Sequence, residues 1–156
     1  MYYYFVTFSP KIKITLEIFR SQIGLYNKLK DDEQSLDEFM SLNRNPFFDL
    51  TTNKFFKTGL VSNEVKRLNL TPKNVVHDHF IQRKKSMKLF FDLLIQNPNM
   101  DVNQFIDFMK KYVSTVGLTK EEHMKVTMLA KNNDEYNFNL YTKCDIIIDG
   151  MGKFVI

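Results

Sequence analysis

Two amphipathic segments in the second half of the chain limit its fold more than any other feature. In the first segment, the apolar residues at helical spacing are Met87, Phe90, Phe91 and Leu94. In the second, they are Val102, Phe105, Ile106, Met109, Tyr112 and Val113. Residues three and four positions apart share one face of a helix, whereas a strand would need strict alternation. We therefore predict two helices that pack through these faces into a core, in preference to a groove for a partner helix.

The start signals of further helices lie on both sides of this pair. Ser9-Pro10 predicts a helix, and the spacing in residues 16–26 favours it over the strand-like alternation of residues 12–18. The aromatic run at residues 2–8 is predicted to be a core strand or core packing.

Capping boxes mark three more helix starts. Ser35 with Glu38 predicts a helix toward Asn43 that ends at Asn45-Pro46. Asp101 with Gln104 begins the second amphipathic helix described above. Thr119-Lys120-Glu121-Glu122 predicts a helix through His123 to about Lys131. Residues 62–68 are predicted to form a short helix.

Strand signals are fewer. After the turn at Thr71-Pro72, residues 74–79 are predicted to form a strand, and residues 145–149 and 153–156 flank a glycine-containing turn that predicts a terminal hairpin. The expected fold is mainly α with a small β hairpin element (α+β), as one compact domain over residues 1–156 with roughly five or six helices.

The composition excludes several classes of protein. With 44% hydrophobic and 14% aromatic residues, the chain is not expected to be disordered. The single cysteine, Cys144, excludes an internal disulfide and a cysteine-based zinc site, and it fits a reducing cytoplasm. No apolar run approaches the length of a membrane span. The preference for Lys, Asn and Phe over Ala indicates an AT-rich genome, such as that of a phage or a low-GC bacterium.

Positive charge is concentrated in one part of the chain. Residues 51–90 hold nine Lys or Arg and two acids, a balance of +7, whereas the whole chain carries +4. Such a stretch is typical of proteins that bind a phosphate backbone. A solvated lysine-rich face is an equally weighted alternative.

One short run within this basic stretch could carry chemistry. Asp78 and His79 are adjacent, and Arg83 follows four positions later. A carboxylate binds a hard cation, a neutral imidazole takes a proton from water, and a guanidinium binds a phosphate oxygen. Because neighbouring strand residues point to opposite faces, both side chains can serve one site only if the strand bends or ends there.

The run Val75-Val76-His77-Asp78-His79-Phe80-Ile81-Gln82-Arg83 resembles the catalytic strand of the HNH (His-Me finger) endonucleases, especially small phage-encoded members. The resemblance covers residues 58–130 and implies a ββα centre that holds one divalent metal, Mg²⁺ or Mn²⁺. It implies that His79 is the general base, that Asp78 and His123 are metal ligands, and that Arg83 lies near the scissile phosphate.

The chain departs from the family pattern in several places. From His79 to His123 is 44 residues (123 − 79), which is long for a ββα unit and includes a whole helix. Gln82 stands where proline is usual. His77 lies on the same side of the strand as His79, so either could be the base. Asn97 and Asn99 are rival candidates for the last metal ligand, although the run Asn-Pro-Asn is also ordinary turn chemistry.

The expected function is therefore a metal-dependent DNA endonuclease, phage-encoded and acting in the host cytoplasm. Its expected nucleic-acid-binding residues are Arg83, Lys84, Lys85 and Lys88. Many such enzymes dimerise, so a homodimer is a possible assembly of this chain. The alternatives are a non-catalytic helical nucleic-acid-binding protein and a small phage protein that binds a host protein.

Overall fold

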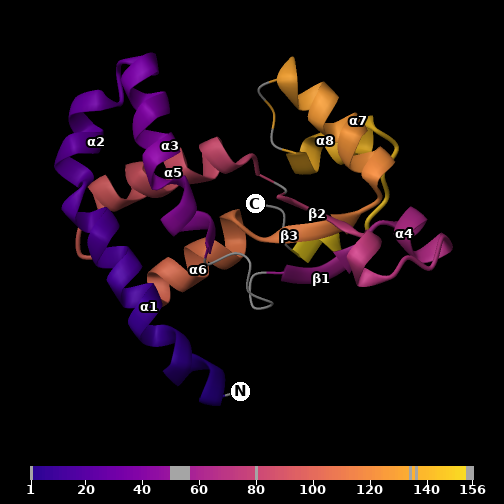
Figure 1. Ribbon diagram of the computed structural model, residues 1–156, viewed down its shortest axis with the longest axis horizontal. Coiled ribbons are helices and arrows are strands. Elements are labelled where there is room, and N and C mark those ends of the chain that lie inside the picture. Colours follow the sequence, from indigo (N-terminus) through magenta and orange to yellow (C-terminus); the bar gives the residue numbers. More distant parts are fainter. Residues whose placement is uncertain (1, 50–56, 80, 134, 136, 154–156) are drawn as a thin grey trace.

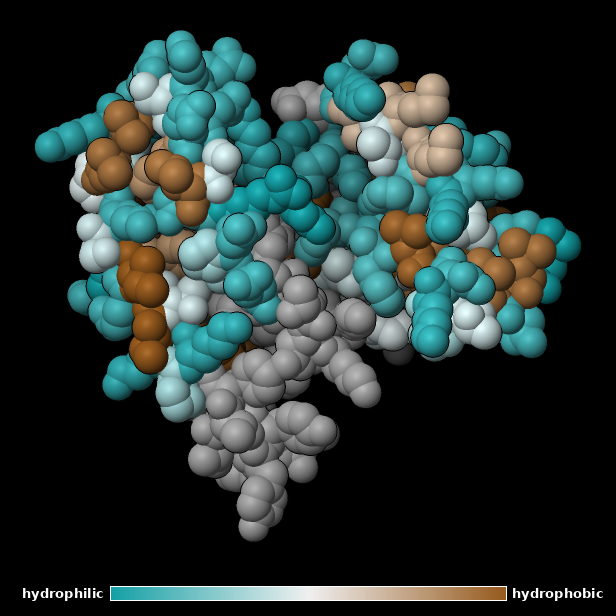
Figure 2. All heavy atoms as spheres, in the orientation of Figure 1, coloured by the Kyte–Doolittle hydropathy of each residue, from teal (hydrophilic) through white to brown (hydrophobic). Residues whose placement is uncertain are grey.

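The computed structural model describes residues 2–49, 57–79, 81–133, 135 and 137–153, and the side chains of all of these except residues 2–9, 48, 57 and 153. The chain forms two lobes that lie side by side (Figure 1). One lobe, the helical lobe, contains helices only. The other, the sheet lobe, contains a small sheet with helices around it. The outer surface in the view of Figure 2 is mostly hydrophilic, with apolar side chains in separate spots.

The helical lobe is built on a core of phenylalanines. Its helices are α1 (Tyr2–Ser21), α2 (Ile23–Leu29), α3 (Glu33–Asp49), α5 (Arg83–Gln96) and α6 (Val102–Tyr112). Phe90 and Phe91 of α5 are fully buried and their rings contact the ring of Phe19 edge-on. Such edge-to-face contacts add to the free energy gained by burying each ring. Within the described part of the chain, no helix combines the length and apolar character needed to cross a membrane.

The sheet lobe has a mixed three-stranded sheet of order β1-β3-β2. Its elements are β1 (Lys57–Val61), α4 (Asn63–Arg67), a 3₁₀ turn η2 (Pro72–Asn74), β2 (Val76–His79), β3 (Thr115–Leu118), α7 (Lys120–Lys131), α8 (Asn137–Lys143) and a second 3₁₀ turn η3 (Met151–Lys153). The central strand β3 is parallel to β1 and antiparallel to β2. Tyr112, at the end of α6, packs against the apolar cores of both lobes.

Several sequence predictions are confirmed. The fold is mainly helical with a small sheet, although the described residues form eight α-helices and not the five or six expected. Both predicted capping boxes of the second half are present, Asp101 with Gln104 and Thr119 with Glu122. The short helix predicted at residues 62–68 is α4, and the Ser62 hydroxyl accepts a hydrogen bond from the backbone N–H of Val65 at its start.

Three predicted helix boundaries are wrong. The first helix begins at Tyr2, not at Ser9-Pro10, so residues 2–8 are helical and do not form a strand. Pro10 lies inside this helix, where proline removes one backbone hydrogen bond without ending the helix. In α3, the capping carboxylate is Asp32, which accepts from the N–H of Ser35, and the helix continues past Pro46.

The strand predictions need more correction. The predicted strand at residues 74–79 begins at Val76, because Pro72–Asn74 is a 3₁₀ turn. The terminal hairpin is wrong for the described residues: residues 145–149 are not in a strand, and residues 154–156 lie outside the described part. The carbonyl of Ile147 instead accepts a hydrogen bond from the N–H of Asn63, at 2.9 Å. Strands β1 and β3 were not predicted.

Gly117 in β3 shows why a glycine stands in the middle of this sheet. A Cβ atom built there would lie 2.6 Å from Cγ1 of Val75 and 2.8 Å from Cγ1 of Val61. These distances are shorter than van der Waals contact, so any larger residue must displace the side chains of these two valines. Gly117 therefore allows the valines on both sides to close over the central strand.

Replacement of Gly117 by alanine should destabilise the protein by about 1 to 3 kcal/mol, because the added methyl group overpacks the sheet. Gly24→Ala is the matched control, since nothing lies within 4 Å of its added Cβ in α2. Alanine there should be neutral or stabilising by up to about 1 kcal/mol. Urea unfolding of both variants measures the difference, and equal effects would contradict the packing account.

Candidate functional site

The carboxylate of Asp78 is buried between the sheet and two helices. Asp78 is only 3% exposed, and both of its oxygens accept hydrogen bonds. Oδ1 lies 2.9 Å from Nδ1 of His123 in α7. Oδ2 accepts from the hydroxyl of Tyr141 at 2.6 Å and from the amide of Asn137 at 3.3 Å, both in α8. Three donors therefore offset the cost of removing this carboxylate from water.

His123 joins this buried carboxylate to the surface. Its side chain is 37% exposed, and its Nδ1 is committed to Asp78. With Nδ1–H as the donor, the neutral ring carries its lone pair on Nε2. The hydrogen bond to Asp78 raises the pKa of His123, against a smaller opposing effect of burial. Asp78 and His123 thus form a carboxylate–imidazole pair whose second ring nitrogen is available for proton exchange.

The first turn of α7 is fixed by a second buried carboxylate. Glu122 is buried and its Oε2 accepts from the Ser62 hydroxyl at 2.6 Å and from the N–H of Thr119 at 2.9 Å. Ser62 also begins α4 by accepting from the N–H of Val65. The starts of α4 and α7 are therefore tied together, and this connection sets the position of His123 one residue further on.

His79 lies on the opposite face of β2. In the β2–β3 register Asp78 pairs with Val116 and His79 pairs with Thr115, so the two side chains point away from each other. His79 is 9% exposed, and its Nδ1 lies 2.9 Å from the carbonyl oxygen of Val113. Burial lowers the pKa of His79 to about 4, although the hydrogen bond to Val113 opposes this. A buried imidazole on this face is not placed to act with Asp78 and His123 on a water molecule.

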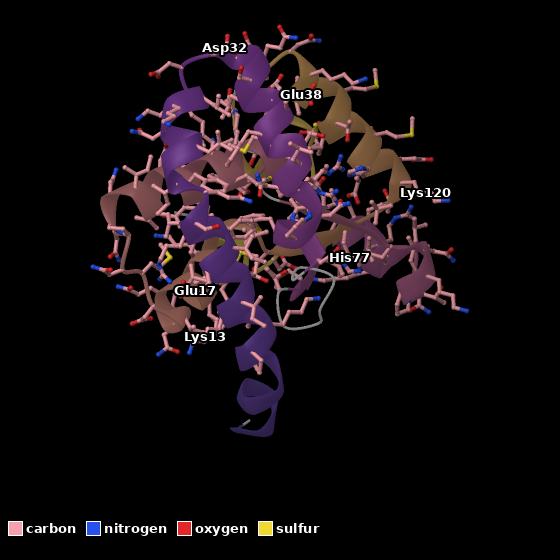
Figure 3. The ribbon with its side chains drawn as sticks, turned by 60° about the vertical axis from the view of Figure 1, so that its left-hand side comes forward. Lys13, Glu17, Asp32, Glu38, His77 and Lys120 are labelled. Atoms are coloured by element: carbon pink, nitrogen blue, oxygen red, sulfur yellow. The ribbon has the colours of Figure 1, made fainter. Side chains whose placement is uncertain are left out.

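The other histidine predicted as a base is exposed. His77 alternates with Asp78 and so lies on the same side of β2 as His79. Figure 3 shows His77 and Lys120 on the sheet lobe, whereas Glu17 and Glu38 belong to α1 and α3 of the helical lobe. The structure therefore brings together Asp78 and His123, and it separates both from His77 and His79.

The predicted metal ligands contact each other in this arrangement. Both oxygens of Asp78 are bonded to protein donors, and Nδ1 of His123 is bonded to Asp78. The pair consequently does not offer two direct ligands to Mg²⁺, which prefers oxygen. Among the described residues, no group of three or more His, Cys, Asp or Glu side chains is arranged to hold a metal.

The rival metal ligands lie in the other lobe. Asn97 ends α5, where its backbone N–H donates to the carbonyl of Leu93. Arg20 of α1 donates to the carbonyl of Pro98 at 2.7 Å, which holds this loop against the helical lobe. Asn97 and Asn99 are therefore loop residues that do not belong with Asp78.

Some cations of the predicted basic region form ion pairs within the fold. Lys84 forms an ion pair with Asp37 of α3, and Lys85 lies 3.5 Å from the carbonyl oxygen of Glu135. Lys88 and Arg83 are exposed. Further ion pairs in this stretch are Lys66–Asp149 and Arg67–Glu64.

Two arginines from different helices affect each other at this surface. Partial desolvation of the guanidinium, although Arg83 keeps an exposed surface, and then the positive charge of Arg44 in α3, lower the pKa of Arg83 at the start of α5. A bound anion would relieve this repulsion between two guanidinium groups. Arg44 had no signal in the sequence that linked it to Arg83.

Tyr141 and Asn137 were also missed by the sequence analysis. Their spacing of four residues on a helix places them on one face, but no local pattern indicates that this face meets β2. The only available signal was the polarity of two positions on a helix that otherwise packs apolar side chains.

Comparisons of this chain with protein-family models, with curated proteins and with solved structures found no match.

The burial of His79 predicts an acid-sensitive fold. Its pKa is about 4 in the folded chain and about 6.5 when unfolded, so the unfolded chain binds more protons between these values. Stability should therefore fall as pH decreases from 6.5 to 4, by up to about 3 kcal/mol from this group. His79→Asn retains an N–H donor for Val113 and cannot titrate, so it should flatten the pH dependence of urea unfolding in this window. An unchanged slope would contradict the assignment.

Proposed function

We propose that this protein hydrolyses phosphodiester bonds in DNA and that the Asp78–His123 pair is its acid–base group. One observation carries the proposal. A buried carboxylate, held by three donors, binds one ring nitrogen of a histidine whose other nitrogen can exchange protons with bound substrate or water. Carboxylate–imidazole pairs of this kind orient the ring and stabilise its charged form in many acid–base sites.

The chemistry assigned to each member of the pair follows from its environment. Asp78 holds Nδ1–H, so the neutral ring of His123 presents Nε2 as a base toward a water molecule. Once protonated, the same nitrogen can return the proton to the leaving oxygen. The raised pKa of His123 increases its protonated fraction near neutral pH, which suits the second step.

The order of the elements supports the link with HNH endonucleases. Strands β2 and β3 pair antiparallel, and α7 follows and packs on both strands. This is the strand–strand–helix order that the resemblance implies, with α5 and α6 inserted between the strands. The proposal differs from the resemblance in two respects. It assigns the acid–base role to His123 in place of His79, and it does not use Asp78 and His123 as metal ligands.

The substrate phosphate is assigned to the surface beside Arg44 and Arg83. Two guanidinium groups from α3 and α5 provide bidentate donors to phosphate oxygens, which lysines do not. Arg83 is also the first residue of α5, where backbone N–H groups favour an anion. This charge supports a polyanionic substrate, and DNA is the substrate that the resemblance implies.

The requirement for Mg²⁺ or Mn²⁺ stays a prediction. Asp78 and His123 as arranged do not form its ligand set, so no step of the proposed reaction is derived through a metal. The remaining nitrogen of His123 is a single ligand, and a hard cation would need oxygen donors from the substrate phosphate or from water.

His123→Ala should abolish the nicking of supercoiled plasmid DNA, with a rate loss of about 10²- to 10⁴-fold, because the acid–base group is removed. Asp78→Asn should also lose activity, since an amide cannot stabilise the imidazolium. His77→Ala is the matched control, an exposed histidine on the other face of β2, and should keep the wild-type rate. Gel assays with equal amounts of folded protein measure all three.

The same assay separates the alternatives. If plasmid stays intact under all metal conditions, including added Mg²⁺, Mn²⁺ and chelator, but DNA binding weakens steeply with salt, the protein is a non-catalytic binder. Loss of nicking in His77→Ala with full activity in His123→Ala would contradict the proposed pair. If neither cleavage nor binding is observed, the nucleic-acid account as a whole is wrong.

A further inference from the structure

A cavity lies between α8 and the chain segment that follows it. Its volume is about 360 Å³, and its walls include Phe138, Ile146, Ile148 and Met151. This volume is within the range of small-molecule sites in proteins, which are mostly apolar with a few polar groups. In Figure 1 this segment leaves α8 (yellow) and returns along the sheet lobe toward β1.

The segment that closes the cavity is fixed at several points. The N–H of Ile146 donates to the carbonyl of Tyr141 at 2.9 Å, and the carbonyl of Ile147 accepts from the N–H of Asn63 at 2.9 Å. Asp149 forms an ion pair with Lys66 at 3.1 Å. These contacts join the segment to both α8 and α4, so the cavity is formed without any ligand.

One charged residue, Asp145, lies at the edge of this apolar cavity. It follows the end of α8 with a φ of 57°, in the left-handed region that often ends a helix. The last carbonyl groups of a helix carry partial negative charge, which disfavours a carboxylate and favours a cation beside them. The polar edge is therefore complementary to a positive charge, while the walls suit an apolar group.

We propose that this cavity binds an organic ammonium ion that has an apolar body, with the apolar part inside and the ammonium group at Asp145. The inference does not depend on the proposed hydrolytic activity. It rests on the cavity, its apolar walls and the position of a single carboxylate at its edge. A ligand of the same shape that carries a carboxylate should be disfavoured, because its negative charge would be repelled by that of Asp145.

The cavity also contacts the Asp78–His123 pair through one side chain. Tyr141 lines the cavity, and its hydroxyl donates to Oδ2 of Asp78 at 2.6 Å. A ligand that shifts the Tyr141 ring therefore shifts the hydrogen bond that holds Asp78. Ligand binding in the cavity and the geometry of the pair are consequently coupled.

The test uses three probes of one shape, namely 2-phenylethylammonium, 2-phenylethanol and 3-phenylpropanoate. Each is titrated into ¹⁵N-labelled protein, and amide signals of α8 and residues 145–151 are followed. The ammonium probe should bind more tightly than the alcohol, and the carboxylate should bind least. Asp145→Asn should weaken the ammonium probe by about fivefold, as for a partly exposed ion pair, and leave the alcohol unchanged.

Asp107→Asn is the matched control, because it removes the same charge from an exposed residue of α6, outside the cavity wall. It should leave all three affinities unchanged. The proposal is overturned if the ammonium probe leaves the signals of α8 and residues 145–151 unshifted, if the carboxylate binds as tightly, or if both Asn variants behave alike.

Tyr141→Phe tests the link to the pair. In the wild type, the ammonium probe should shift the ring signals of His123, and in Tyr141→Phe it should bind without this shift. A shift of equal size in both proteins would refute the coupling through Tyr141.

Discussion

The hydrogen bonds to the buried carboxylate of Asp78 are the interaction on which the arrangement of the sheet lobe depends. A charge that is 3% exposed is tolerated only if donors replace the water it has lost. His123 comes from α7, and Tyr141 comes from α8. Both helices therefore lie on the same face of β2, where the carboxylate of Asp78 joins them. Loss of any donor leaves an incompletely bonded buried charge, which costs more than the bond contributed.

The alternation of side chains along β2 gives neighbouring residues different roles. Asp78 faces α7 and α8, where it meets a half-exposed imidazole that can exchange protons. His79 faces the other way and binds the carbonyl of Val113, at the end of α6. Ser86 of α5 adds a bond to the carbonyl of Tyr112 at 3.0 Å. His79 is thus part of the connection between the two lobes, while the proposed acid–base pair lies on the face that carries Asp78.

The features that could be predicted from the sequence are those that depend on residues close together in the chain. The capping residues Asp101 and Thr119 identified the starts of α6 and α7, because a cap and its partner are three residues apart. β1 and β3 were missed, since their pairing joins residues far apart in the chain. For the aromatic run of residues 2–8 we predicted a core strand or core packing; the strand alternative is wrong, although aromatic residues favour strands, because the run is helical.

Contacts between residues far apart in the chain also limited the prediction of the candidate site. Asp78 and His123 were chosen as partners from their resemblance to a family pattern, and they do lie together. Their mode of contact could not be predicted, because it depends on where α8 places Tyr141 and Asn137. His79 was chosen as a base although strand alternation already directed it away from Asp78. The alternation of side chains along a strand predicted the orientation of His79 correctly, whereas the motif did not.

The most direct test of the pair is the tautomer of His123, measured by long-range ¹H–¹⁵N correlation of the histidine rings at a pH where His123 is neutral. The protein has three histidines, so the ring signals can be assigned by substitution. The structure predicts that the neutral ring carries its proton on Nδ1 and that Asp78→Asn shifts the population toward the Nε2–H form. A ring that carries its proton on Nε2 in the wild type would contradict the bond to Asp78 and the chemistry derived from it.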